Sequence, residues 1–77
     1  MNADRRKRLE KAVGWIEDAK QAVEEVAGEE REAFENLPEN MQSGEKGQAM
    51  SDAADKLDDV ASELDRAVDD IRDSMEQ

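Results

Sequence analysis

The chain has 77 residues, with 22 acidic side chains, 11 basic side chains, no Cys, no His and a formal net charge of −11. A chain this short is one domain at most, and it buries so little surface that small folds of this size usually rely on disulfides, metals or association. Without Cys there is no disulfide, and without His the usual ligand sets of zinc, haem and most transition-metal sites are missing. Oligomerisation is the support that remains.

The charges are unevenly placed along the chain. Residues 1–20 carry six basic and four acidic side chains, whereas residues 21–77 carry five and eighteen. An acidic body disfavours direct contact with nucleic acid and anionic membrane, and it favours attraction to basic protein surfaces. No stretch approaches the about 20 apolar residues of a membrane span, and residues 1–8 are not followed by the apolar run of a signal peptide. We therefore expect a cytoplasmic protein.

The first predicted helix spans residues 4–36, or begins one residue earlier at Ala3, with Asp4 as its candidate N-cap. Apolar residues recur at alternating steps of three and four, which is typical of one helix face. This main stripe consists of Leu9, Val13, Ile16, Val23, Ala27, Phe34 and Leu37. Gly14 and Gly28 each cost about 1 kcal/mol relative to Ala in a helix, unless close packing uses them.

A second apolar row lies beside the main stripe, so the apolar sector covers about half of the helix circumference at 100° per residue. The row consists of Ala12, Ala19, Val26 and Ala33, extended by Trp15 and Ala22. A helix that packs against one neighbour needs a narrower stripe. We therefore predict a homodimer, and Trp15 belongs to its core or, alternatively, to the binding site of an external partner. The predicted dimer interface consists of Trp15, Ile16, Ala19, Ala22, Val23, Val26 and Ala33.

Residues 37–43 are predicted to form a loop, because Pro38 disfavours helical geometry at Leu37. Ser43 is the expected N-cap of a second helix over residues 44–74. Its apolar stripe consists of Met50, Ala54, Leu57, Ala61, Leu64, Val68, Ile71 and Met75, and a row of Ala53, Val60 and Ala67 flanks this stripe. A loop this short makes the helices antiparallel. The expected fold is all-α, an αα-hairpin of two long amphipathic helices, and two copies are expected to form a four-helix bundle.

Catalytic and metal sites have few candidates. A Ser nucleophile lacks a His base, so the usual acid, base and nucleophile constellations cannot be assembled. The carboxylates follow neither the EF-hand pattern nor the Glu-x-x-His pairs of di-iron bundles. We expect no enzymatic activity, no metal and no cofactor.

Aspartate dominates the second helix, although Glu is the better helix former. Between Asp52 and Asp73, nine carboxylates include eight Asp and only Glu63. Short Asp side chains at helical spacing hold negative charges about 6 Å apart, a spacing comparable to that of phosphates along a nucleic-acid strand. This row either imitates nucleic acid toward a basic partner or is a solvated polar face. The candidate partner-binding residues are Asp52, Asp55, Asp58, Asp59, Asp69, Asp70 and Asp73.

The basic run Arg5 to Arg8 lies at the start of the first helix. In an antiparallel hairpin this start lies near the end of the second helix. We therefore expect the run to pair with acidic residues of the second helix, from Asp69 to Glu76, within the chain or between two copies. Binding to nucleic acid is the weaker alternative, because four charges without interleaved aromatic residues make a weak nucleic-acid patch.

The segment AFENLPENMQSGEKGQAM resembles the middle of a family of short acidic proteins found in bacteria and their phages, in which a run such as AF-x-NLPE-x-x-Q precedes a Ser-initiated helix carrying G-x-AM. The matching residues are Ala33, Phe34, Asn36, Leu37, Pro38, Glu39, Gln42, Ser43, Gly47, Ala49 and Met50. The resemblance implies a helical hairpin and a phage or prophage origin, and it assigns no activity.

Two functional hypotheses follow from these features. The first is a non-enzymatic, homodimeric acidic interaction module, in its strongest form a phage-derived inhibitor that mimics nucleic acid and binds a basic surface of a host defence or regulatory protein. The alternative is a small structural or assembly adaptor that binds a partner helix through its apolar stripe. Salt separates the two, because binding through charges weakens steeply with ionic strength and helix-groove binding does not.

Overall fold

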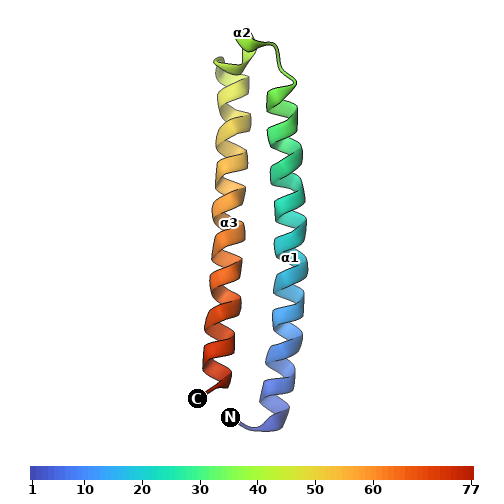
Figure 1. Cartoon of the computed structure of the whole chain (residues 1–77), viewed down its shortest axis with the longest axis vertical. Coiled ribbons are helices and arrows are strands. Elements are labelled where there is room, and N and C mark those ends of the chain that lie inside the picture. Colours follow the sequence, from blue (N-terminus) through green and yellow to red (C-terminus); the bar gives the residue numbers. More distant parts are fainter.

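The computed structural model describes residues 1–77 and consists of two long antiparallel helices with a short connection between them (Figure 1). Helix α1 spans Ala3–Glu35, the single turn α2 spans Glu39–Gln42, and α3 spans Glu45–Met75. The long helices pack side by side along a slab that measures 58 × 16 × 12 Å. The predicted pair of long helices is therefore confirmed. None of the helices is long and apolar enough to cross a membrane.

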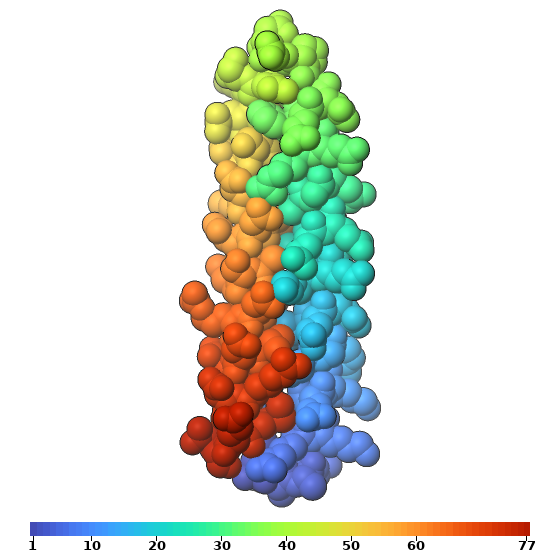
Figure 2. Space-filling view, viewed as in Figure 1, coloured from blue at the N-terminus to red at the C-terminus, as the bar shows by residue number.

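The seam between α1 and α3 is built from the two predicted main stripes, whose members are all buried or half-buried. Its most buried apolar residues are Val13, Ala27, Ala54, Ala61 and Val68. Three of these five are Ala, so the core is narrow and contributes little apolar burial. Figure 2 views one broad side of the slab, where side chains of the two helices meet along its length.

The first helix begins at Ala3, one of the two predicted starts, but its N-cap is Asn2 and not Asp4. Asn2 has an extended backbone, and its Oδ1 accepts a hydrogen bond from the backbone N of Arg5 at 2.8 Å. An N-cap needs this non-helical geometry, which Asp4 lacks because it already lies inside the helix. Asp4 instead pairs with Arg8 at 3.1 Å, one turn further along.

The predicted N-cap of the second helix is also wrong. Ser43 has helical backbone angles (φ −86°, ψ −4°) and ends α2, whereas Gly44 is extended and precedes Glu45 without a side-chain cap. The reason lies upstream, because the backbone N atoms of Met41 and Gln42 donate to the carbonyl oxygen of Pro38. This turn extends the helical conformation through Ser43 and moves the start of α3 by one residue.

Gln42 and Gly47 hold the connection together. The Nε2 atom of Gln42 lies 3.1 Å from the carbonyl oxygen of Leu37, 3.3 Å from that of Phe34 and 3.4 Å from that of Glu35. It therefore serves the carbonyls that the end of α1 leaves without helical partners. Gly47 is buried, and a Cβ atom there would lie 2.6 Å from the carbonyl carbon of Gln42 and nearer still to its oxygen. Only Gly fits this close approach.

Candidate interaction surfaces

One broad side of the slab carries exposed apolar residues from both helices. At about 100° per residue, Trp15, Ala19, Ala22 and Val26 fall on one line of α1, about a quarter turn from the seam. Val60 lies about a quarter turn from the seam on the same side of α3. These five residues, all exposed, are called the apolar face. Trp15 is 67% exposed, Val26 51% and Val60 38%.

The predicted dimer residues divide into two groups. Trp15, Ala19, Ala22, Val26 and Ala33 are exposed, and the first four belong to the apolar face. Ile16 and Val23 are half-buried, because they lie in the main stripe that packs against α3. Val60 was not among the predicted interface residues. Its place in the row flanking the second stripe was the signal that could have found it.

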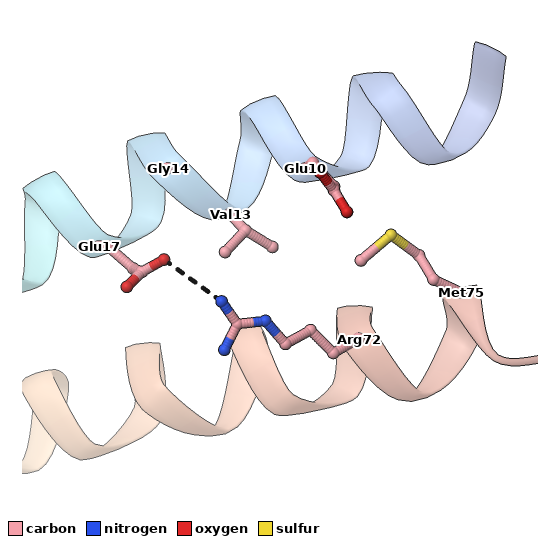
Figure 3. A pocket seen from close by; sticks show the side chains of 6 residues that line it. All are labelled: Glu10, Val13, Gly14, Glu17, Arg72 and Met75. Carbon is pink, nitrogen blue, oxygen red and sulfur yellow. Dashed lines mark ion pairs between the residues drawn. The ribbon is translucent and has the colours of Figure 1, made fainter. Parts of the chain in front are cut away.

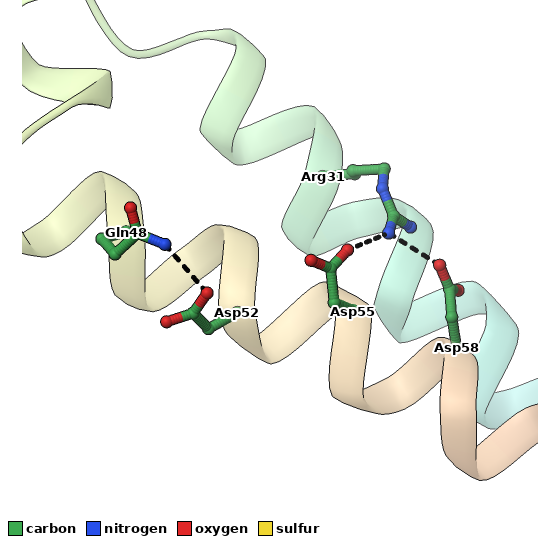
Figure 4. Close-up of polar contacts among 5 residues, drawn as sticks. All are labelled: Arg31, Gln48, Asp52, Asp55 and Asp58. Atoms are coloured by element: carbon green, nitrogen blue, oxygen red, sulfur yellow. Dashed lines mark hydrogen bonds and ion pairs between the residues drawn. The ribbon is translucent and has the colours of Figure 1, made fainter.

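The opposite broad side of the slab carries the ion pairs between the helices. Arg31 of α1 reaches two carboxylates of α3, with its Nη2 atom 3.0 Å from Oδ1 of Asp55 and 2.6 Å from Oδ2 of Asp58 (Figure 4). The hydrogen bond to Asp58 raises the pKa of Arg31 above its ordinary value, although desolvation acts in the other direction. The guanidinium therefore stays charged and holds this part of α3 against α1.

A second ion pair joins the centres of the long helices. Lys20 occupies a seam position of α1, its side chain is 28% exposed, and its Nζ lies 2.8 Å from Oδ1 of Asp65. The hydrogen bond to Asp65 raises the pKa of Lys20 above 10.5. In the sequence Lys20 interrupts the apolar stripe, and Asp65 was not among the predicted site residues. The sequence did contain a signal for this pair. A basic residue in the stripe of one helix lies level with an acidic residue beside the stripe of the other, once the two helices are aligned antiparallel.

The seven candidate aspartates are all exposed and lie on the side of α3 away from the apolar face or at its outer edge. Three of them have partners within the chain: Asp55 and Asp58 bind Arg31, and Asp52 accepts a hydrogen bond from Nε2 of Gln48 at 2.9 Å (Figure 4). The four whose carboxylates make no ion pair or side-chain hydrogen bond are Asp59, Asp69, Asp70 and Asp73, called here the free aspartates. No group of carboxylates is arranged to hold a metal ion.

The predicted pairing of the basic run with the end of α3 does not form within the chain. Arg8 pairs with Asp4 inside α1, and Arg5, Arg6 and Lys7 form no ion pair. Four consecutive helical residues point around the whole circumference, so they cannot all face one neighbour. The link between the helices near this end is instead a longer contact of 3.6 Å between Arg72 and Glu17.

A shallow hollow of about 230 Å³ lies between the helices near the chain termini (Figure 3). Gly14 leaves space there, because nothing lies within 4 Å of where its Cβ would be. The charged groups on its walls include Glu17 and Arg72, which satisfy each other. Glu10 is the one further titratable group on the walls, so the hollow offers a single free carboxylate with neither a base nor a nucleophile beside it. Its lining residues are Glu10, Val13, Gly14, Glu17, Arg72 and Met75.

Comparisons with protein-family models, with curated proteins and with solved structures found no match to this chain. The resemblance of the loop segment to short acidic phage and bacterial proteins thus stays a prediction, and function must be argued from the surfaces themselves.

Proposed function

We propose that this chain is a non-enzymatic, cytoplasmic protein-interaction module that dimerises through its apolar face and binds a basic protein surface through its free aspartates. The observation that carries the proposal is the separation of the two surfaces. Exposed apolar side chains gather on one broad side of the slab, while the aspartates of α3 lie away from them. One surface can therefore be covered by a second copy while the other stays accessible.

The need for a second copy is supported by the surface that a single chain exposes. A compact monomer of 8.6 kDa would expose about 4,700 Å², whereas this chain exposes 5780 Å². Its exposed surface includes Trp15 and two Val residues, Val26 and Val60. Stacking two slabs on their apolar faces gives a four-helix bundle, which removes these side chains from water and adds to a narrow core.

The acidic surface supports binding to a basic partner. The free aspartates form no ion pair within the chain, and the net charge of −11 attracts positively charged surfaces from a distance. Rigid Asp side chains along a helix hold charge at a spacing of about 6 Å. In its strongest form the proposal is nucleic-acid mimicry, with the chain acting as a phage-derived inhibitor of a host defence or regulatory protein.

A second candidate function is favoured by the exposure of Trp15. A side chain of this size with 67% of its surface exposed is a typical anchor for a partner. On this alternative the chain is an assembly adaptor, and its apolar face binds a helix of another protein rather than a second copy.

The test is affinity capture from a lysate of the source cells with matched variants. One variant changes the four free aspartates to Asn, and its control changes Glu24, Glu25, Glu32 and Glu35 of α1 to Gln, which removes the same charge from another surface. We expect the Asn variant to lose the captured protein and the Gln control to keep it. Capture by the parent should also weaken as salt rises from about 0.05 M to about 0.5 M, and added double-stranded DNA should compete.

Two other outcomes would contradict the proposal, and each would identify a different cause of binding. Equal loss in both variants would mean that net charge and not the aspartate row attracts the partner. Capture that survives the Asn variant and high salt, and is lost on changing Trp15 to Ser, would replace the acidic module by the apolar adaptor.

A further inference from the structure

We propose that the second copy docks head to tail, so that α1 of one chain packs antiparallel on α1 of the other with Trp15 against the partner's Val26. The proposal rests on the proposed homodimer and adds its orientation and register. Each broad side of the slab measures about 58 by 16 Å, roughly 900 Å² in projection. A stable interface needs about 800 Å² from each partner, so one broad side is sufficient.

The order of side-chain sizes on α1 supports the register. Along the apolar face, the large Trp15 is followed by Ala19 and Ala22 and then by the larger Val26. The pattern reads large, small, small, large in both directions, about a centre between residues 20 and 21. When an identical helix is reversed and placed on it, Ala19 lies opposite the partner's Ala22. Two small residues at the crossing allow the backbones to approach, and each Trp15 fits beside the partner's Val26.

The charge distribution supports the same orientation. The half of the slab that carries the loop, residues 20–59, has twelve acidic and four basic side chains. The other half, residues 1–19 and 60–77, has ten acidic and seven basic side chains. A head-to-tail dimer places each strongly acidic half on the partner's less acidic half. A head-to-head dimer would place the two strongly acidic halves together, which costs more repulsion.

Lys11 and Glu29 give the proposed dimer a specific ion pair. Both lie on the same flank of the apolar line of α1, at about 100° per residue, and they are nearly equidistant from the proposed centre. Neither has an ion-pair partner within the chain. In the head-to-tail arrangement Lys11 meets the partner's Glu29 at both ends of the α1 contact.

Spin labels at the loop test the orientation directly. The chain has no Cys, so Asn40→Cys, which is exposed in α2, provides one labelling site. In the head-to-tail dimer the two labels are about one slab length apart, which is 58 Å. In a head-to-head dimer they are within about 25 Å, since packed helices lie about 10 Å apart. Dipolar electron spin resonance on the labelled dimer separates these two distances.

The outcomes distinguish the orientation from the dimer itself. Sedimentation at the mass of one chain, with no dipolar signal, would refute both the homodimer and its orientation. Sedimentation at twice the chain mass with the short distance would leave the homodimer intact and overturn the head-to-tail proposal. The long distance is the expected result.

A charge swap tests the register. We expect Lys11→Glu and Glu29→Lys each to raise the dimer dissociation constant several-fold at low salt, because each places like charges together. The double variant restores the pair in reversed form and should bring the constant back toward that of the parent. Arg66→Glu, an exposed change at the outer edge of α3 that reverses the same charge, controls for net charge. A double variant that is no better than the two single ones would overturn the register.

Discussion

Replacing Gly47 by Ala should destabilise the protein, although Ala is the better helix former. The three helical glycines provide a matched set, because a Cβ atom added at Gly14 or Gly28 would have nothing within 4 Å of it. At Gly47 the same atom would lie 2.6 Å from the carbonyl carbon and 2.7 Å from the Cα of Gln42. These are backbone atoms, so the clash cannot be relieved by turning a side chain.

The expected magnitudes follow from these distances. Gly14→Ala and Gly28→Ala should each add about 0.8 to 1 kcal/mol to the free energy of unfolding, which is a rise of about 4 to 8 °C in Tm for a domain of this size. At Gly47 the overpacking costs about 1 to 3 kcal/mol. Moving Gln42 also weakens its hydrogen bonds to α1, each of which contributes about 0.5 to 1.5 kcal/mol. The net result is a loss of about 1 to 3 kcal/mol.

Thermal melts followed by circular dichroism measure all three variants. The protein concentration must be the same in every melt, because association makes Tm depend on concentration. The changes at Gly14 and Gly28 lie away from the apolar face and leave the proposed interface intact. If Gly47→Ala melted at or above the Tm of the parent, the close approach of α3 to α2 would be refuted as the reason for Gly47.

Three further predictions concern charge and association. Because the pKa of Lys20 is raised, its pair with Asp65 contributes its full stability below pH 10.5, and this stability is lost as the pH rises through the folded-state pKa. Above pH 10.5 the Tm should therefore fall more steeply in the parent than in Lys20→Met, and equal slopes in thermal melts would contradict this. Raising NaCl from about 0.01 M to about 0.5 M should increase Tm, because the net charge of −11 repels itself and the Debye length shrinks below about 10 Å; a fall in Tm would show that the ion pairs outweigh the repulsion. Trp15 fluorescence should shift to the red on dilution as the proposed dimer separates and the ring enters water, whereas emission independent of concentration would place Trp15 outside any self-association interface.

Periodicity predicted the two long helices and the seam because it directly records which side chains leave water. Leu9, Val13 and Ile16 on α1, like Ala54 and Ala61 on α3, all lie in the seam at the predicted positions. The same periodicity placed the second apolar row of α1 outside the seam, and those residues are exposed apart from the half-buried Ala12. The sequence therefore predicted both the helices and the face of each helix that packs against the other.

Caps and ion pairs were less predictable, because they depend on backbone angles and on the register between helices. Ser is a residue type that favours N-caps, but Ser43 lacks the extended backbone that an N-cap needs. Because the turn after Pro38 continues through Ser43, Gly44 has the extended backbone instead. Arg31 takes up two of the seven candidate aspartates, Asp55 and Asp58. No spacing within one helix reveals that contact, since it depends on how α1 and α3 are aligned.

The separation of the two surfaces resolves an apparent conflict in this sequence. A net charge of −11 on 77 residues opposes self-association, yet the narrow Ala-rich core favours it. On the apolar face the four residues of α1 carry no charge, and the free aspartates lie on the far side or outer edge of α3. In the proposed head-to-tail dimer these carboxylates point outward, where water and salt screen their repulsion. Substitutions in the aspartate row should therefore alter partner binding without dissociating the dimer, and substitutions at Trp15 should act in the opposite order.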